Sequence, residues 1–223
     1  MESPPLASLS LTHVHYDPTD RISLLCAYLA LLPQALCITY ATLTIFTREV
    51  EIALLFGGQL SCEALNLILK RTIKEHRPAT HQGKGYGMPS SHAQFLSFWA
   101  TSLSLFLLLR HRPRGPHAWS PRHRACLSLV ALSLAALTAW SRAYLGYHSP
   151  RQVVVGCLAG GVFALFWFRL TSWVRCSGVL EWALGCRVAR ALRVRDLVVY
   201  EDLCQAGWEK WERARAKNGV DVS

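Results

Sequence analysis

The sequence predicts an all-α membrane protein, a bundle of about five helices that cross a bilayer. Hydrophobic residues make up 52% of the chain and charged residues only 17%, fewer than in an ordinary soluble domain. The charges are also clustered, and several stretches between the clusters are long enough to span a membrane. The same apolar content argues against an intrinsically disordered chain.

Each expected span is a stretch between charges, because a spanning helix needs about 20 mostly apolar residues. No Asp, Glu, Lys, Arg or His lies between Arg21 and Arg48, which bound the first stretch. The other stretches lie between residues 51 and 70, 92 and 110, 124 and 142, and 151 and 175. The 51–70 stretch contains Glu63, and an acid at mid-depth costs a few kcal/mol, roughly. We count residues 52–69 as a span as well, which makes five.

The Arg-rich loops predict the orientation. With five spans, the 110–124 loop and the C-terminal tail lie on one side, and their Arg content makes that side cytoplasmic. The chain then divides into a non-cytoplasmic segment 1–21, a transmembrane domain 22–174 and a cytoplasmic tail 175–223. Basic residues in the 70–92 loop favour the reverse orientation.

Charge and cysteine content exclude other classes of protein. The net charge is +10, but the basic clusters lie beside apolar runs, so we expect a membrane orientation signal and no nucleic-acid partner. The eight Cys are scattered without a C-x-x-C pair, which predicts neither a disulfide framework nor a zinc site. Gly156 and Gly160 form a small-xxx-small pattern, typical of close helix packing.

Three polar clusters lie at the ends of the expected spans. The first contains Lys70 and Arg77, seven residues apart. These cations are either anchors at a helix end or a cradle for an anion, since a guanidinium matches phosphate oxygens and an ammonium adds a compact charge. Both interpretations remain open for this cluster alone.

The second cluster, residues 85–92, leads directly into the third span and ends in Ser90, Ser91 and His92. It reads as a helix start with a capping Ser, and a helix N-terminus is also a ready site for an anion.

The third cluster, residues 141–150, contains Arg142 and His148. Gly146 and Pro150 predict a break between two helices that exposes His148 at the start of the next one. An interfacial His and an anchoring Arg are the alternative interpretation.

All three clusters lie on one side of the membrane if the third and fourth stretches both span. Two His then suit a two-step phosphoryl transfer, in which one attacks phosphorus and the other protonates the departing oxygen. The loops contain no acidic cluster with magnesium spacing, so we expect no metal and no other cofactor.

The three clusters together resemble the signature of the type 2 phosphatidic acid phosphatase superfamily. The pattern reads Lys-x6-Arg-Pro, Pro-Ser-Ser-His and Ser-Arg-x5-His over residues 70–152. Within that superfamily, the runs 86–95, 11–16 and 144–148 are similar to those of dolichyldiphosphatases. The resemblance implies the superfamily's helical bundle, with the catalytic pocket at the membrane interface.

The resemblance also implies a role for each site residue. His148 would be the nucleophile that forms a phosphohistidine, and His92 the general acid. The phosphoryl oxygens would be held by Lys70, Arg77, Ser90, Ser91 and Arg142. The superfamily motif usually reads Pro-Ser-Gly-His, so Ser90 matches its serine better and Ser91 stands at its glycine position.

One residue departs further from the superfamily pattern. Gln152 stands where the pattern has an Asp that orients the nucleophilic His, and an amide carries no charge. Glu63 and Asn66 lie on the same helix face as Lys70. We therefore predict that Glu63, directly or through Asn66, supplies the missing negative charge. A structural contact between Glu63 and Arg169 is the alternative.

By this resemblance, the chain is a multi-pass enzyme of the endoplasmic reticulum membrane with its site facing the lumen. It would hydrolyse dolichyl diphosphate to dolichyl phosphate and inorganic phosphate, which returns the lipid carrier to N-glycosylation. One alternative is a phosphatase of another lipid, such as phosphatidic acid. A second, from another class, is an inactive membrane scaffold or transporter, which the intact His92 and His148 argue against.

Overall fold

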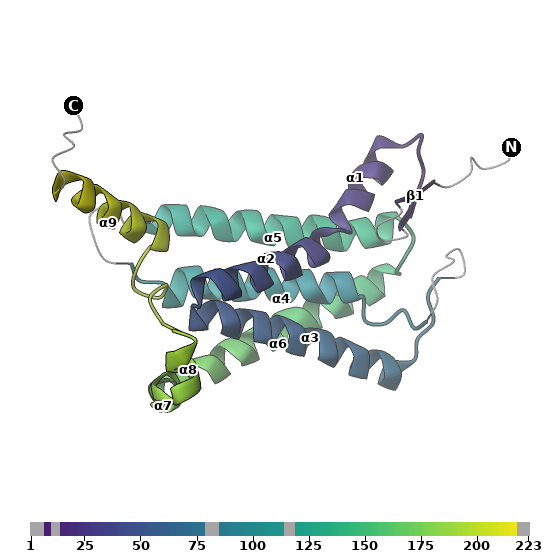
Figure 1. Cartoon of the computed structure of the whole chain (residues 1–223). Coiled ribbons are helices and arrows are strands. Elements are labelled where there is room, and N and C mark those ends of the chain that lie inside the picture. Colours follow the sequence, from purple (N-terminus) through teal and green to yellow (C-terminus); the bar gives the residue numbers. More distant parts are fainter. Residues whose placement is uncertain (1–6, 10–13, 79–84, 114–118, 218–223) are drawn as a thin grey trace, which may run out of the picture.

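A computed structural model describes residues 7–9, 14–78, 85–113 and 119–217. Long helices lie side by side in one bundle (Figure 1), and five helical stretches are long and apolar enough to cross a membrane. The helices are α1 (Arg21–Leu29), α2 (Leu32–Thr47), α3 (Val50–Ile73), α4 (Ser91–Leu105), η1 (Phe106–Arg110), α5 (Pro121–Tyr144) and α6 (Pro150–Cys176). The five predicted spans are therefore confirmed, including the one that contains Glu63.

The first span consists of two helices, α1 and α2, that separate at Ala30 and Leu31. Pro33 lies in the first turn of α2. A proline has no backbone N–H and its ring clashes with the carbonyl four residues earlier, so it can begin α2 but cannot continue α1. The break leaves the carbonyl of Ala30 available to another helix.

A short hairpin precedes the bundle and is a small departure from the all-α prediction. Strand β1 (Ala7–Leu9) pairs antiparallel with β2 (Val14–Tyr16). The backbone N–H of His15 donates to the Tyr147 hydroxyl at 2.7 Å, which joins β2 to the turn between α5 and α6. Part of the 11–16 run, residues 11–13, lies outside the described residues.

Helix α4 lies at the centre of the bundle and packs most closely on α6 and α5. The two glycines of the small-xxx-small pattern face it. A Cβ added to Gly160 would lie 2.2 Å from the carbonyl oxygen of Gln94, and one added to Gly156 would lie 2.8 Å from that of Ser90. The predicted close packing is confirmed, and it holds the start of α4 against α6.

We expect Gly160→Ala to destabilise the protein by about 1–3 kcal/mol or more, because backbone atoms cannot rotate away from the added methyl group. Thermal unfolding in detergent measures this loss. Gly161→Ala is the matched control, since its Cβ would meet only the Ser97 hydroxyl at 3.6 Å, an ordinary contact. Equal melting temperatures for the two variants would contradict the packing argument.

The C-terminal tail forms α7 (Val179–Gly185), α8 (Arg187–Ala191) and α9 (Leu203–Lys217) at one end of the bundle (Figure 1). The segment between α8 and α9 is tied to the start of α3. The buried carboxylate of Glu49 accepts hydrogen bonds from the backbone N–H groups of Leu197 (2.8 Å) and Val198 (3.1 Å) and pairs with Arg195 at 2.7 Å.

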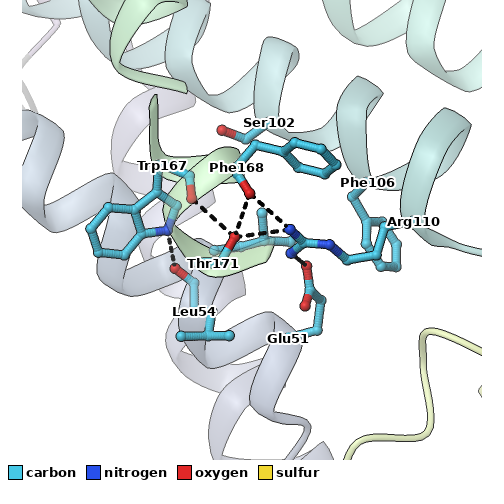
Figure 2. A pocket seen from close by; sticks show the side chains of 9 residues that line it. Glu51, Leu54, Ser102, Phe106, Arg110, Trp167, Phe168 and Thr171 are labelled. Carbon is cyan, nitrogen blue, oxygen red and sulfur yellow. Dashed lines mark hydrogen bonds and ion pairs between the residues drawn. The ribbon is translucent and has the colours of Figure 1, made fainter. Parts of the chain in front are cut away.

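A second buried carboxylate, Glu51, lies in the first turn of α3 at the same end. It pairs with Arg110 at 2.5 Å and with Arg175, which also pairs with Asp196 of the tail. Figure 2 shows the Arg110 guanidinium between Glu51 and α6, where it donates to the Phe168 carbonyl and the Thr171 hydroxyl. These contacts join α3, η1, α6 and the tail.

Candidate active site

The three polar clusters meet at the end of the bundle opposite the tail, as predicted. Two backbone hydrogen bonds join the segments that carry them. The N–H of Gly87 donates to the Glu75 carbonyl at 2.7 Å, and the N–H of Ser90 donates to the Gln152 carbonyl at 3.2 Å. The loop after α3, the start of α4 and the start of α6 therefore form one site.

His148 lies in the turn between α5 and α6. The backbone N–H groups of Tyr147 and His148 both donate to the Arg142 carbonyl, at 3.0 and 3.3 Å, and Gly146 has a φ of +73° that favours glycine. The predicted helix break is confirmed. The expectation that the break exposes His148 is wrong, because this residue is only 4% exposed and its side chain packs inward beside Gln152.

Gln152 fixes the orientation of the His148 ring. Helix α6 begins with a capping box, in which the Ser149 hydroxyl accepts from the Gln152 N–H and the Gln152 side chain accepts from the Ser149 N–H. A backbone N–H can only donate, so the Gln152 oxygen, Oε1, faces it at 3.2 Å. The same oxygen lies 3.3 Å from Nδ1 of His148.

This arrangement determines the tautomer of His148. Because Oε1 of Gln152 can only accept, Nδ1 of the neutral imidazole must carry the proton. Nε2 then carries the lone pair, which a nucleophile needs. Burial lowers the pKa of His148 to about 3, with the positive charges of Arg77 and Arg142 lowering it further and the Gln152 hydrogen bond acting in the opposite direction. The ring is therefore neutral at ordinary pH.

His92 lies in the first turn of α4, and its Nε2 is 3.1 Å from the Ala30 carbonyl at the break between α1 and α2. A carbonyl can only accept, so Nε2 carries a hydrogen, and Nδ1 is the nitrogen that can exchange a proton with a ligand. The Pro33 break thus positions a residue from the second polar cluster.

The two serines of the second cluster have different surroundings. Ser91 donates to Asn66 Oδ1 at 3.0 Å and accepts from the Lys70 ammonium at 2.5 Å. Ser90 is the residue before α4 and is fully buried. Its hydroxyl has no hydrogen-bond partner among the described residues and does not cap the helix, contrary to the expectation of a capping Ser at this position.

The guanidinium groups of Arg77 and Arg142 carry buried donors that the described residues do not satisfy. These donors are Nε of Arg77 and both Nε and Nη1 of Arg142. Arg142 is 3% exposed and lies over the Tyr147 ring, 4.2 Å from its centroid. Burial lowers the pKa of Arg77. Buried cations with unpaired donors are costly unless an anion joins them, so this part of the site suits a phosphate group.

Glu63 lies outside this network. It lines a groove of about 470 Å³ between α2, α3 and α4, together with apolar residues, Ser91 and His92. It makes no hydrogen bond or ion pair with Asn66, Gln152, His148 or Arg169 in the described part of the chain. The bonds of Asn66 lead to Gln94 and Ser91. The support of His148 by Glu63 therefore remains a prediction, and no contact of Glu63 among the described residues supports it.

Two residues at the site were missed in the sequence. Glu75 accepts a hydrogen bond from Gln152 Nε2 at 3.0 Å, and Tyr147 packs against Arg142 and accepts from His15. The spacing of Ser149 and Gln152 could have indicated the capping box. Nothing in the sequence pattern indicates that Glu75 reaches Gln152 across the loop.

Comparison with known proteins places these residues in a family. The family described as "PAP2 superfamily" matches residues 51–176, which include all three clusters. A Neurospora crassa protein named "Putative dolichyldiphosphatase" is 52% identical over 95% of this chain and 93% of its own length. Human "Dolichyldiphosphatase 1" is 40% identical over 74% of this chain and 71% of its own length. The Saccharomyces cerevisiae "Dolichyldiphosphatase" is 32% identical over 83% of this chain and 79% of its own length.

No solved structure matches the chain significantly. The family match covers more than half of the chain and extends from the second span to the end of the fifth. The resemblance seen in the three motifs is therefore confirmed, and the chain is a multi-pass membrane protein that belongs to the PAP2 superfamily.

Proposed function

We propose that this protein hydrolyses dolichyl diphosphate to dolichyl phosphate and inorganic phosphate, through a phosphohistidine on His148. The observation that carries the proposal is a buried imidazole with its lone pair on Nε2, in the field of Lys70, Arg77 and Arg142. The names of the relatives from Neurospora, human and yeast support the choice of substrate.

The first step transfers the terminal phosphoryl group. The lone pair of His148 Nε2 attacks the terminal phosphorus, and the bond from phosphorus to the anhydride oxygen breaks. His92 acts here as the imidazolium: it keeps the hydrogen on Nε2 and gives the proton on Nδ1 to that oxygen, so dolichyl phosphate leaves without an unfavourable extra charge. The cations and the N–H groups at the start of α4 hold the remaining phosphoryl oxygens.

The second step releases inorganic phosphate. A water molecule gives a proton to His92 and attacks the phosphorus of the phosphohistidine, which breaks the P–N bond and regenerates neutral His148. His92 thus ends the cycle in the state in which it began. The unpaired Ser90 hydroxyl can donate to a phosphoryl oxygen, and Lys70 with Ser91 forms a second contact beside it.

The groove beside Glu63 suits the lipid part of the substrate. It opens between α2, α3 and α4, its lining includes Pro33, Cys37, Ile38 and Phe95, and it ends at Ser91 and His92. An isoprenoid chain could lie in it with the diphosphate at the site. This arrangement would let a membrane lipid reach the site without leaving the bilayer.

The site would face the lumen of the endoplasmic reticulum. The end of the bundle opposite the site holds the tail, the end of η1 and the start of α5. Four arginines lie there: Arg110 in η1, Arg112 just after it, and Arg122 and Arg124 in α5. The positive-inside rule makes that end cytoplasmic. The tail 175–223 would then be cytoplasmic and the segment 1–21 lumenal.

A glycosylation acceptor tests this orientation. We expect an acceptor inserted in the 79–85 segment to be glycosylated and one in the 112–122 loop to remain unmodified, as seen by a shift in gel mobility. The opposite pattern would place the site on the cytoplasmic face.

A phosphate-release assay on a panel of lipids tests the reaction. We expect the purified protein in detergent to release phosphate from dolichyl diphosphate much faster than from phosphatidic acid, with EDTA present. Faster release from phosphatidic acid would favour the alternative lipid phosphatase. No release from any lipid would favour a scaffold.

A further inference from the structure

The Gln152 amide links His148 to a carboxylate. Its Oε1 faces Nδ1 of His148, and its Nε2 donates to Glu75 Oε1 at 3.0 Å and to the His76 carbonyl at 2.8 Å. Gln152 is 1% exposed. Both hydrogens of the amide nitrogen are therefore used, and the chain of contacts runs from the imidazole through the amide to the carboxylate.

We propose that Glu75 is a positioning residue for the phosphoryl transfer, and that it acts on His148 through Gln152. This inference rests on the proposed function, in which His148 is the nucleophile. The superfamily pattern has an Asp at position 152, whose carboxylate would contact His148 directly. Glu75 would supply that negative charge instead, through the amide of Gln152.

The chemistry of the first step explains why such a charge is needed. When Nε2 of His148 bonds to phosphorus, the ring becomes a cation that keeps its hydrogen on Nδ1. This cation forms near Arg77 and Arg142, whose charges oppose it. A carboxylate that accepts from Gln152 Nε2 makes Oε1 a stronger acceptor, because linked hydrogen bonds polarise one another. Glu75 thereby stabilises the developing imidazolium.

The loop that carries Glu75 is built closely around this amide. A Cβ on Gly87 would lie 2.8 Å from both Nε2 and Oε1 of Gln152. The Gly87 N–H also donates to the Glu75 carbonyl at 2.7 Å. Gln152 therefore has no room to turn away from His148, and the backbone of Glu75 is held where its side chain reaches the amide.

The hydrogen bonds favour Glu75 over Glu63 as the source of negative charge. Glu75 contacts Gln152 directly, whereas Glu63 lies in the groove and has no bonded path to His148 through the described residues. The sequence hypothesis of a supporting carboxylate at Glu63 has no contact among the described residues to support it.

Glu75→Gln is the first test, because the new amide oxygen can still accept from Gln152 Nε2 while the charge is lost. We expect kcat and the single-turnover rate of phosphohistidine formation to fall by about tenfold or more, about 1.4 kcal/mol. KM should change by less than about twofold, since Glu75 does not contact the substrate. Glu181→Gln on α7, far from the site, is the control and should keep the native rates.

A pair of substitutions that exchanges the carboxylate and the amide distinguishes an effect of Glu75 on the reaction from an effect on folding. Gln152→Glu alone places two carboxylates at hydrogen-bond distance and should be poorly active. Combined with Glu75→Gln, it restores one carboxylate and one amide in reversed order, with the carboxylate now directly on His148. The His76 carbonyl loses its donor in both variants that carry Gln152→Glu, so these two are compared with each other. We expect the double variant to form phosphohistidine faster than Gln152→Glu alone, by about threefold or more, about 0.7 kcal/mol.

The outcomes distinguish this inference from the proposed function. If His148→Ala forms no phosphoenzyme but Glu75→Gln keeps native rates, Glu75 has no positioning role and the proposed function stands. If the double variant is no faster than Gln152→Glu alone, the two positions are not coupled in the reaction and the inference is wrong. If His148→Ala still forms phosphoenzyme, the proposed nucleophile itself is wrong.

Discussion

His148→Ala is expected to abolish both turnover and the covalent phosphoenzyme, because no other lone pair replaces Nε2 at the phosphorus. His92→Ala should differ. The nucleophile remains, so a substrate with a good leaving group should still phosphorylate His148. Turnover of dolichyl diphosphate should fall by about 10²–10⁴, the usual contribution of a general acid. Acid-quench trapping of radiolabelled enzyme, beside steady-state phosphate release, measures the two effects.

The control for both variants is His123→Ala. His123 lies exposed in the first turn of α5 at the other end of the bundle, where its ring hydrogen-bonds with Ser120. It should retain native turnover and trapping. Phosphoenzyme trapped with His148→Ala, at a level equal to that of the native enzyme, would exclude His148 as the nucleophile.

Arg142→Ala should lower kcat by about 10²–10³, as the loss of a buried donor to a transition-state oxygen does in other enzymes. The residue is 3% exposed, and its Nε and Nη1 have no partner among the described residues. Arg142→Lys should recover little of this loss. An ammonium lacks the planar fork that binds two phosphoryl oxygens and stacks on the Tyr147 ring.

Arg151→Ala is the matched control for Arg142. Arg151 lies in the first turn of α6, three residues from His148, but its side chain is exposed. If electrostatic attraction of the diphosphate were the whole effect, both variants would lose activity similarly and the loss would shrink with salt. A loss confined to Arg142 and insensitive to salt is the expected result.

The transmembrane part of the fold was predictable from the sequence, because a span is recognised from the length of one apolar stretch and the charges that bound it. Long stretches with at most one charged residue predicted the five spans, and Gly156 with Gly160 predicted the close approach of α4 and α6. The meeting of the three clusters at one end of the bundle followed from the parity of the spans. Each inference needed only local composition.

The contacts within the site were not predictable in the same way. The Glu75–Gln152 bond joins residues 77 positions apart, and the bond from His92 to the Ala30 carbonyl joins residues 62 apart. Neither leaves a local pattern in the sequence. The prediction that Glu63 supplies the negative charge depends on its sharing a helix face with Lys70. A shared face does not determine which neighbour a side chain contacts. The predicted exposure of His148 was wrong because a residue at a helix break can still pack inward, away from solvent.

The contacts of Glu49 and Glu51, at the end of the bundle opposite the site, have a consequence for biosynthesis. Glu49 and Glu51 lie at the start of the second span. The tail donors to Glu49 come much later in the chain, with Leu197 following it by 148 positions. Ribosomal synthesis completes all five spans before it adds these donors. A nascent chain that ends after α6 therefore holds the Glu49 carboxylate without Arg195 and the backbone donors of the tail. The bundle closes last at the end opposite the site, so its final stability depends on the chain having been translated past Val198.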